Sequence, residues 1–152
     1  AQAQELKIGY VNADRVLRDA TPAKAAQAKL EAEFGKREKE LADMANKLKA
    51  AGEKLDKDAP TLAESERNRR QRELVEQNRD FDRKRREFQE DLTQRKNEEL
   101  ASVVERANKV MKQIFDSEKY DLILQEAVFA GPKIDITDKV IKALNAQSGN
   151  SK

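Results

Sequence analysis

The fold is decided by residues 60–115, which read PTLAESERNRRQRELVEQNRDFDRKRREFQEDLTQRKNEELASVVERANKVMKQIF. After Pro60 this stretch contains neither glycine nor proline. Thr61 can cap the first free amides of a helix, and Glu64, three residues later, can reach back to the amide of the cap. The stretch therefore predicts one helix from Thr61 to Phe115, roughly 80 Å long at 1.5 Å per residue, which is too long to wrap around a single small core.

The apolar residues change character along this predicted helix. In its first half Leu74, Phe81 and Phe88 stand seven residues apart and form a narrow seam on one face, while most other residues are charged or carry amides. After residue 92 the stripe becomes broader; it includes Leu100, Val103, Ala107, Val110 and Ile114. We therefore expect the first half to be solvated and the second half to be embedded in a folded body.

The composition limits the kind of protein that this chain can form. Of its 152 residues, 39% are charged and 5% are aromatic, and the formal net charge is only +2. Such a two-signed charge pattern with seam-like apolar spacing is typical of a coiled coil. The chain has no cysteine and no histidine, so it lacks a thiol nucleophile, an imidazole base and any Cys or His metal ligand. It also has no apolar run of about 20 residues and no phosphate-binding glycine loop. We expect neither an enzyme nor a cofactor.

A second long helix precedes the first. Thr21 is expected to cap it, Pro22 suits its first position, and the residues before Pro60 end it at about Lys57. Its large apolar residues include a series at strict sevens, namely Phe34, Leu41, Leu48 and Leu55, with Leu30 one turn earlier.

The two apolar series predict how the helices pair. Residues whose numbers sum to 122 face each other in one antiparallel hairpin with a turn at 58–61. The predicted rungs are Leu30 with Leu92, Phe34 with Phe88, Leu41 with Phe81, and Leu48 with Leu74. Each rung contributes about 2 kcal/mol, and polar layers separate the rungs. We expect a marginally stable arm over residues 23–99.

The two ends of the chain predict a small β-containing body, made of residues 1–22 and 116–152 together with 100–115. Strand-forming residues occur at 7–11, 120–125 and 127–130, the last two as a hairpin about Gln125 and Glu126, and a helix is expected over 135–144. Three short strands leave sheet edges exposed, and self-association would cover these edges. The predicted fold class is thus α+β, mostly α: a long helical-hairpin, coiled-coil arm that projects from a body assembled by oligomerisation.

Several short segments of this chain carry a family resemblance. They are KIGYVN at 7–12, RVL at 15–17, LEAEF at 30–34, YDLIL at 120–124 and DITDKVI at 135–141. With these segments in this order, the chain resembles the Skp (OmpH-like) family of periplasmic chaperones.

The resemblance implies a homotrimer whose three arms surround a cavity. The resemblance also implies that the trimer is an ATP-independent holdase. Its cavity would hold unfolded outer-membrane β-barrel proteins and keep them from aggregating while they cross the periplasm. Finally, the resemblance implies that a signal peptide has been removed before Ala1. Two alternatives stay open: a structural coiled-coil spacer, which would have heptads up to its end, and a nucleic-acid-binding coiled coil, which would have basic stripes without interleaved acids.

Basic clusters and two glycines are the candidate functional features of the arm. The clusters are either a solvated face balanced by nearby acids or contacts for acidic client segments and anionic lipid, including lipopolysaccharide. The basic candidates are Arg69, Arg70, Arg72, Arg83, Lys84, Arg85, Arg86, Arg95 and Lys96. Gly35 and Gly52 each cost roughly 1 kcal/mol inside a helix, so they are either neutral or hinges that let the arm bend.

Overall fold

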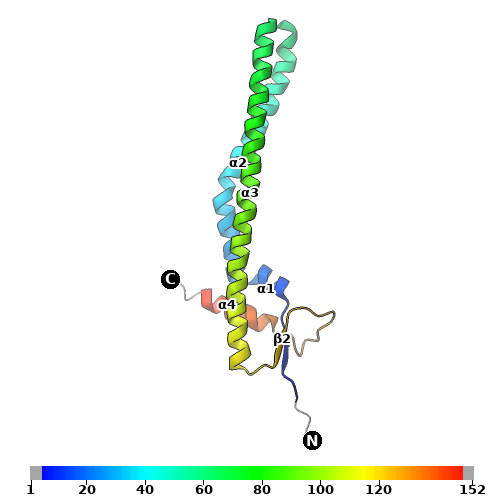
Figure 1. Cartoon of the computed structure of the whole chain (residues 1–152), viewed down its shortest axis with the longest axis vertical. Helices are drawn as coiled ribbons and strands as arrows, with labels where there is room; N and C mark the ends of the chain where they lie inside the picture. Colours follow the sequence, from blue (N-terminus) through cyan, green and yellow to red (C-terminus); the bar gives the residue numbers. More distant parts are fainter. Residues whose placement is uncertain (1–4, 149–152) are drawn as a thin grey trace. The chain divides into compact units, whose positions relative to one another are not determined.

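The computed structural model describes residues 5–148 and divides the chain into two units. One unit, the body, consists of residues 1–29 and 96–152, and the other, the arm, consists of residues 30–95. Two long helices, α2 (Thr21–Asp58) and α3 (Glu64–Ser117), contribute to both units (Figure 1). Residues 1–4 and 149–152, which the sequence assigns to the body, lie outside the described residues.

The arm is an antiparallel pair of helices joined by a tight turn (Figure 1). A short 3₁₀ helix, η1 (Ala59–Thr61), connects them. The prediction that Thr61 caps the second helix is wrong, because its hydroxyl donates back to the Asp58 carbonyl over 2.9 Å. Since η1 turns this hydroxyl away from the chain that follows, α3 begins three residues later, at Glu64.

The start of α2 also differs by one residue from the prediction. Thr21 is the first helical residue, and the carbonyl of Ala20 accepts from the amides of Ala23 and Lys24 at 3.0 and 3.1 Å. Thr21 is therefore not the cap. Its own amide donates to the side-chain oxygen of Asn145 over 2.7 Å, so a residue from the other end of the chain fixes the helix start.

The body contains β1 (Ile8–Tyr10), α1 (Ala13–Asp19), β2 (Leu122–Leu124) and α4 (Thr137–Ser148). The two strands are parallel, with Gly9 opposite Ile123. The predicted hairpin about Gln125 is therefore wrong, and residues 125–130 form no strand. Within residues 5–148 the sheet has two strands and one isolated bridge, between Tyr10 and Asp135.

β1 explains this arrangement because it offers backbone partners on both of its edges. On one edge the amide of Val11 donates to the carbonyl of Leu124 over 2.8 Å. On the other edge the amide of Tyr10 donates to Ile134, and the amide of Ile136 donates to Tyr10, over 2.7 and 2.8 Å. The chain after β2 must cross from one edge to the other, which a tight hairpin would prevent.

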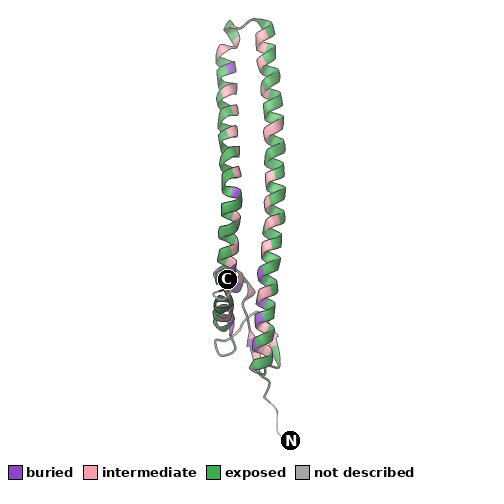
Figure 2. Ribbon diagram, turned by 90° about the vertical axis from the view of Figure 1, so that its left-hand side faces the viewer, coloured by how far each residue is buried: buried purple, intermediate pink, exposed green. Residues whose placement is uncertain are grey.

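The hydrophobic core of the body joins α1, α3, α4 and the strands, and Figure 2 shows where buried residues concentrate. Its buried members are Val11, Val16, Ala20, Ala107, Val110, Ile114, Tyr120, Ile136, Val140 and Leu144. Gly9 lies against this core: a Cβ atom there would be 2.9 Å from Ile136 Cδ1 and 3.2 Å from a Tyr120 ring carbon. A side chain at position 9 would therefore push the strand off the core.

A buried hydroxyl ties the first strand to the last helix. Thr137, which is fully buried, accepts a hydrogen bond from the Asn12 amide over 2.9 Å. Its hydroxyl and amide both donate to one carboxylate oxygen of Asp135, over 2.6 and 2.9 Å. These hydrogen bonds from Thr137, with the Arg15 charge adding to them, lower the pKa of Asp135 below its ordinary value.

The lowered pKa gives the stability of the body a pH dependence of known sign. The contribution of Asp135 is fully present above its unfolded-state pKa, about 3.9, and is lost as the pH falls through its folded-state pKa. Asp135→Asn should therefore destabilise the body more at pH 7 than at pH 2, as measured by urea unfolding. Asp43→Asn, on the exposed face of α2, is the control. A constant cost of Asp135→Asn at both pH values would contradict this assignment.

Candidate functional site

The apolar seam of the arm contains one close aromatic rung. Phe34 is buried, and its ring packs edge to face on the ring of Phe88, with centroids 5.8 Å apart and planes at 77°. This contact agrees with the predicted register. The other predicted seam residues are half-buried, and their pairing stays a prediction: Leu30, Leu41, Leu48, Leu74, Phe81 and Leu92.

Two interhelical ion pairs cross beside this rung. Arg95 forms a bidentate pair with Glu33, with two N–O distances of 3.1 Å, and Arg37 pairs with Asp91 over 3.0 Å. Each helix thus supplies an acid followed four residues later by an arginine. Because the helices are antiparallel, each arginine reaches the acid of the other helix.

The Arg37 side chain also covers the aromatic rung. Its guanidinium carbon lies 5.6 Å from the centroid of Phe34 and 5.5 Å from that of Phe88. An arginine above an aromatic face adds a favourable cation–π contact and shields the rings from water. The sequence reasoning missed Glu33, Arg37 and Asp91, although the shared acid-x-x-x-Arg spacing on both helices was a usable signal.

Near the arm's turn, two of the predicted basic residues are paired with acids. Arg69 contacts both Glu66 and Glu73, with N–O distances of 3.0 and 2.7 Å, and its hydrogen bond lowers the pKa of Glu66. Arg70 reaches Asp58 of the other helix over 3.3 Å. The exposed Arg69 pairs contribute little to stability, whereas the Arg70–Asp58 pair is half-buried; both partly neutralise the cations.

The middle cluster is paired in the same way. Arg83 and Lys84 both contact Asp80. Arg85 lies 3.9 Å from Asp82 and above the ring of Phe81, at 5.9 Å from its centroid.

Three of the nine predicted basic residues lack such a partner. Within residues 5–148, no acidic group lies within 4.0 Å of the cations of Arg72, Arg86 and Lys96, and all three side chains are exposed. These three cations are the ones that an external anion could pair with at no loss of an internal ion pair. Arg95, in contrast, would have to leave Glu33.

The two glycines of the arm are not required by space or by backbone conformation. A Cβ atom at Gly35 or Gly52 would meet nothing within 4 Å, and in the described chain no glycine has a positive φ. Alanine would therefore fit at either position.

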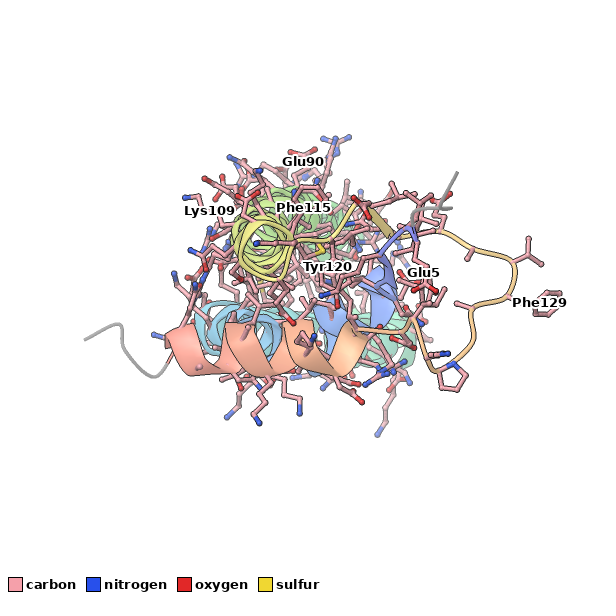
Figure 3. All side chains as sticks on the ribbon, turned by 90° about the horizontal axis from the view of Figure 1, so that it is seen from below. Glu5, Glu90, Lys109, Phe115, Tyr120 and Phe129 are labelled. Carbon is pink, nitrogen blue, oxygen red and sulfur yellow. The ribbon has the colours of Figure 1, made fainter. Side chains whose placement is uncertain are left out.

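The body exposes a second set of candidate residues, all of them apolar. Phe129 and Val128 are 94% and 89% exposed, and Figure 3 shows Phe129 at the outer end of the loop that follows β2. Leu122 and Leu124, on β2 itself, are also exposed. β1 covers one edge of β2, and among the described residues nothing pairs with the other edge. Because the sequence predicts a strand at residues 127–130, it does not predict this exposed loop.

Residues 5–148 contain neither a membrane-spanning helix nor a cluster of metal ligands. None of the helices there has the length and apolar character needed to cross a membrane. In the same range no group of three or more acidic side chains is placed to hold a metal ion.

The comparisons with known proteins place these features in a family. Residues 7–144 match the family described as outer membrane protein (OmpH-like). The chain belongs to this family. Its OmpH-like fold is shared by an OmpH-like outer membrane chaperone from Caulobacter crescentus, with a TM-score of 0.80, 22% identity and coverage of 96% of this chain and 88% of the other.

Relatives named Chaperone protein Skp cover most of this OmpH-like chain. That of Yersinia enterocolitica is 28% identical over 144 residues, 93% of this chain and 88% of its own. That of Pectobacterium atrosepticum is 30% identical over 139 residues, 90% of this chain and 84% of its own. That of Escherichia coli K12 is 29% identical over 138 residues, 91% of this chain and 83% of its own.

Proposed function

We propose that this protein is an ATP-independent holdase chaperone of the periplasm that binds unfolded outer-membrane β-barrel proteins and prevents their aggregation. The observation that carries the proposal is the OmpH-like family match over residues 7–144, together with relatives named Chaperone protein Skp that match over most of both chains. The chemistry is binding and release without a covalent step, so the protein acts as a non-enzymatic partner of its clients.

The surface of the arm suits such a client. An unfolded β-barrel chain has alternating apolar residues that need cover in water, yet it must later leave intact. Long charged side chains offer apolar methylenes while their charged ends stay solvated. Exposed apolar residues such as Val75 add to these contacts. Many weak contacts hold a client without a deep pocket, so its release requires no nucleotide.

The body supports self-association. Exposed Leu122 and Leu124 lie on a strand with one edge that no described residue pairs with, and such an edge pairs readily with another chain. Three chains, the number implied by the family resemblance, would place three arms around one cavity. The homotrimer is therefore part of the proposal.

The basic residues of the arm are proposed to attract acidic client segments and anionic lipid head groups, lipopolysaccharide among them. Within residues 5–148 no acid lies within 4.0 Å of the cations of Arg72, Arg86 and Lys96, which makes these three the leading contacts. Arg69, Arg83, Lys84 and Arg85 act through exposed and exchangeable ion pairs, while Arg70 and Arg95 would first have to leave half-buried pairs.

The glycines are proposed to act as soft points that let the arm admit clients of different size. Because a methyl group fits at Gly35 and at Gly52, Gly→Ala variants change helix stiffness without a clash. Selective loss of large clients by Gly35→Ala is the expected sign of a hinge.

The function is tested by light scattering during dilution of an unfolded outer-membrane β-barrel protein from urea. The protein should suppress aggregation at about one trimer per client without nucleotide, and capture should slow as salt rises. A requirement for ATP, or tighter binding of a DNA duplex than of the client, would overturn the proposal.

A charge-matched pair of variants tests the role of the three free cations. Neutralising Arg72, Arg86 and Lys96 to glutamine should slow client capture several-fold at low salt. The control neutralises three exposed lysines of α2 in the same way, namely Lys39, Lys47 and Lys54. Equal slowing by both variants would show that net charge alone matters, against a specific contact site.

A further inference from the structure

The body carries an exposed apolar projection. Val128 and Phe129, the two most exposed large apolar residues described, lie on the loop between β2 and α4. Figure 3 labels Phe129 on this loop. Leaving a phenyl ring in water costs about as much as burying a core side chain gains. This loop therefore indicates a surface that becomes covered by another molecule.

The same unit carries an apolar hollow. It has a volume of about 140 Å³ and lies between α1 and α3. Its walls include Ala13 and Leu17 of α1 and Val104, Ala107 and Met111 of α3, with Gln125 at the rim. This volume suits a single side chain, because pockets for whole small-molecule ligands begin at about 300 Å³.

The loop of the same chain is held away from this hollow. It starts beside the hollow at Gln125, whose side-chain amide lies 3.9 Å from the sulfur of Met111. It is then fixed at its other end, where Ile134 bonds to Tyr10 on the far edge of β1. Phe129, between these two ends, remains exposed. The hollow is therefore left for a group from outside the chain.

We propose that Phe129 of one copy inserts into the α1–α3 hollow of the next copy. This inference rests on the proposed homotrimer and names the contact that builds it. A projection and a hollow on different surfaces of one chain make a heterologous interface, which closes into a ring when the rotation between copies allows it. Each copy in such a ring gives one projection and receives one.

The first test removes the projection or fills the hollow. Phe129→Ala and, separately, Ala13→Phe should each raise the dissociation constant of the assembly at least tenfold, as measured by sedimentation. Since Phe129 is exposed in the single chain, its removal should leave the helix content unchanged. Val75→Ala, which truncates an exposed apolar residue of the arm, is the matched control and should assemble like the parent.

The second test mixes the two variants. The Phe129→Ala chain keeps its hollow and the Ala13→Phe chain keeps its projection, so one intact interface can form between them. The equal mixture should therefore give a dimer with one chain of each kind, while each variant alone stays a monomer at the same concentration. A ring cannot close in this mixture.

The outcomes separate this inference from the proposed function. Phe129→Ala assembling like the parent would overturn the projection-in-hollow contact and leave the chaperone function standing. Normal assembly with lost client binding would instead assign the hollow or the loop to clients. A parent protein that stays monomeric at micromolar concentration would overturn the homotrimer itself.

Discussion

Phe34→Ala should unfold the arm and leave the body folded. Phe34 is buried and carries the aromatic rung with Phe88, and Arg37 covers both rings. Truncating a buried phenylalanine costs about 3–5 kcal/mol. The described arm consists of two helices, so little other packing is available there to compensate. A loss of this size is comparable with the whole stability expected of such a hairpin.

Segment-resolved hydrogen exchange measures this effect. In the Phe34→Ala variant, amides of residues 30–95 should exchange at least about a hundredfold faster, as a loss of 3 kcal/mol implies. Amides of α1 and α4 should keep their rates. Val75→Ala is the control, since this side chain is exposed. Equal acceleration in the arm and in the body would show that the two units unfold together, against this expectation.

Leu144→Ala should have an effect of similar size on the body. Leu144, on α4, is fully buried in the core that includes Val16 and Val140. Replacing a fully buried leucine by alanine costs about 2–5 kcal/mol. α4 packs against α1. The loss should therefore spread to α1 and to β1, which precedes α1 in the chain, and self-assembly should weaken as well.

Urea unfolding at a fixed protein concentration measures this loss, since assembly itself stabilises the folded chain. The midpoint for the body should fall, while exchange in the arm stays at its parental rate. Lys142→Ala, an exposed position on the same helix, is the control. If only residues 137–148 exchanged faster, α4 would be a separate unit and not a part of the cooperative core.

The arm could be predicted well because its information is local. Helix formation and heptad spacing depend on residues three, four and seven apart, so the two long helices and the Phe34–Phe88 contact followed from the printed sequence. The crossed ion pairs of Glu33 with Arg95 and Arg37 with Asp91 depend on the register of both helices together. The acid-x-x-x-Arg spacing is present on each helix, but the structure decides which acid each arginine reaches.

The ends of the helices could be predicted less well. The sequence motif at Thr61 and Glu64 fits a helix cap, yet the 3₁₀ turn at 59–61 uses the Thr61 hydroxyl for the Asp58 carbonyl. A threonine hydroxyl can cap a helix amide or donate to a nearby backbone carbonyl, and these two uses compete. Which hydrogen bond Thr61 forms depends on the path of the chain after Pro60. Residue types alone do not reveal this path.

By itself, the sequence determined the mostly helical class, the antiparallel arm and the family resemblance, because these rest on periodicity and on short ordered segments. Only the tertiary structure decided the β part of the body. Residues 120–130 favour strands wherever they lie, but β1 comes from the other end of the chain and offers backbone partners on both edges. It therefore takes β2 as a parallel neighbour and Ile134 to Ile136 on its far side, and Phe129 is left exposed between them.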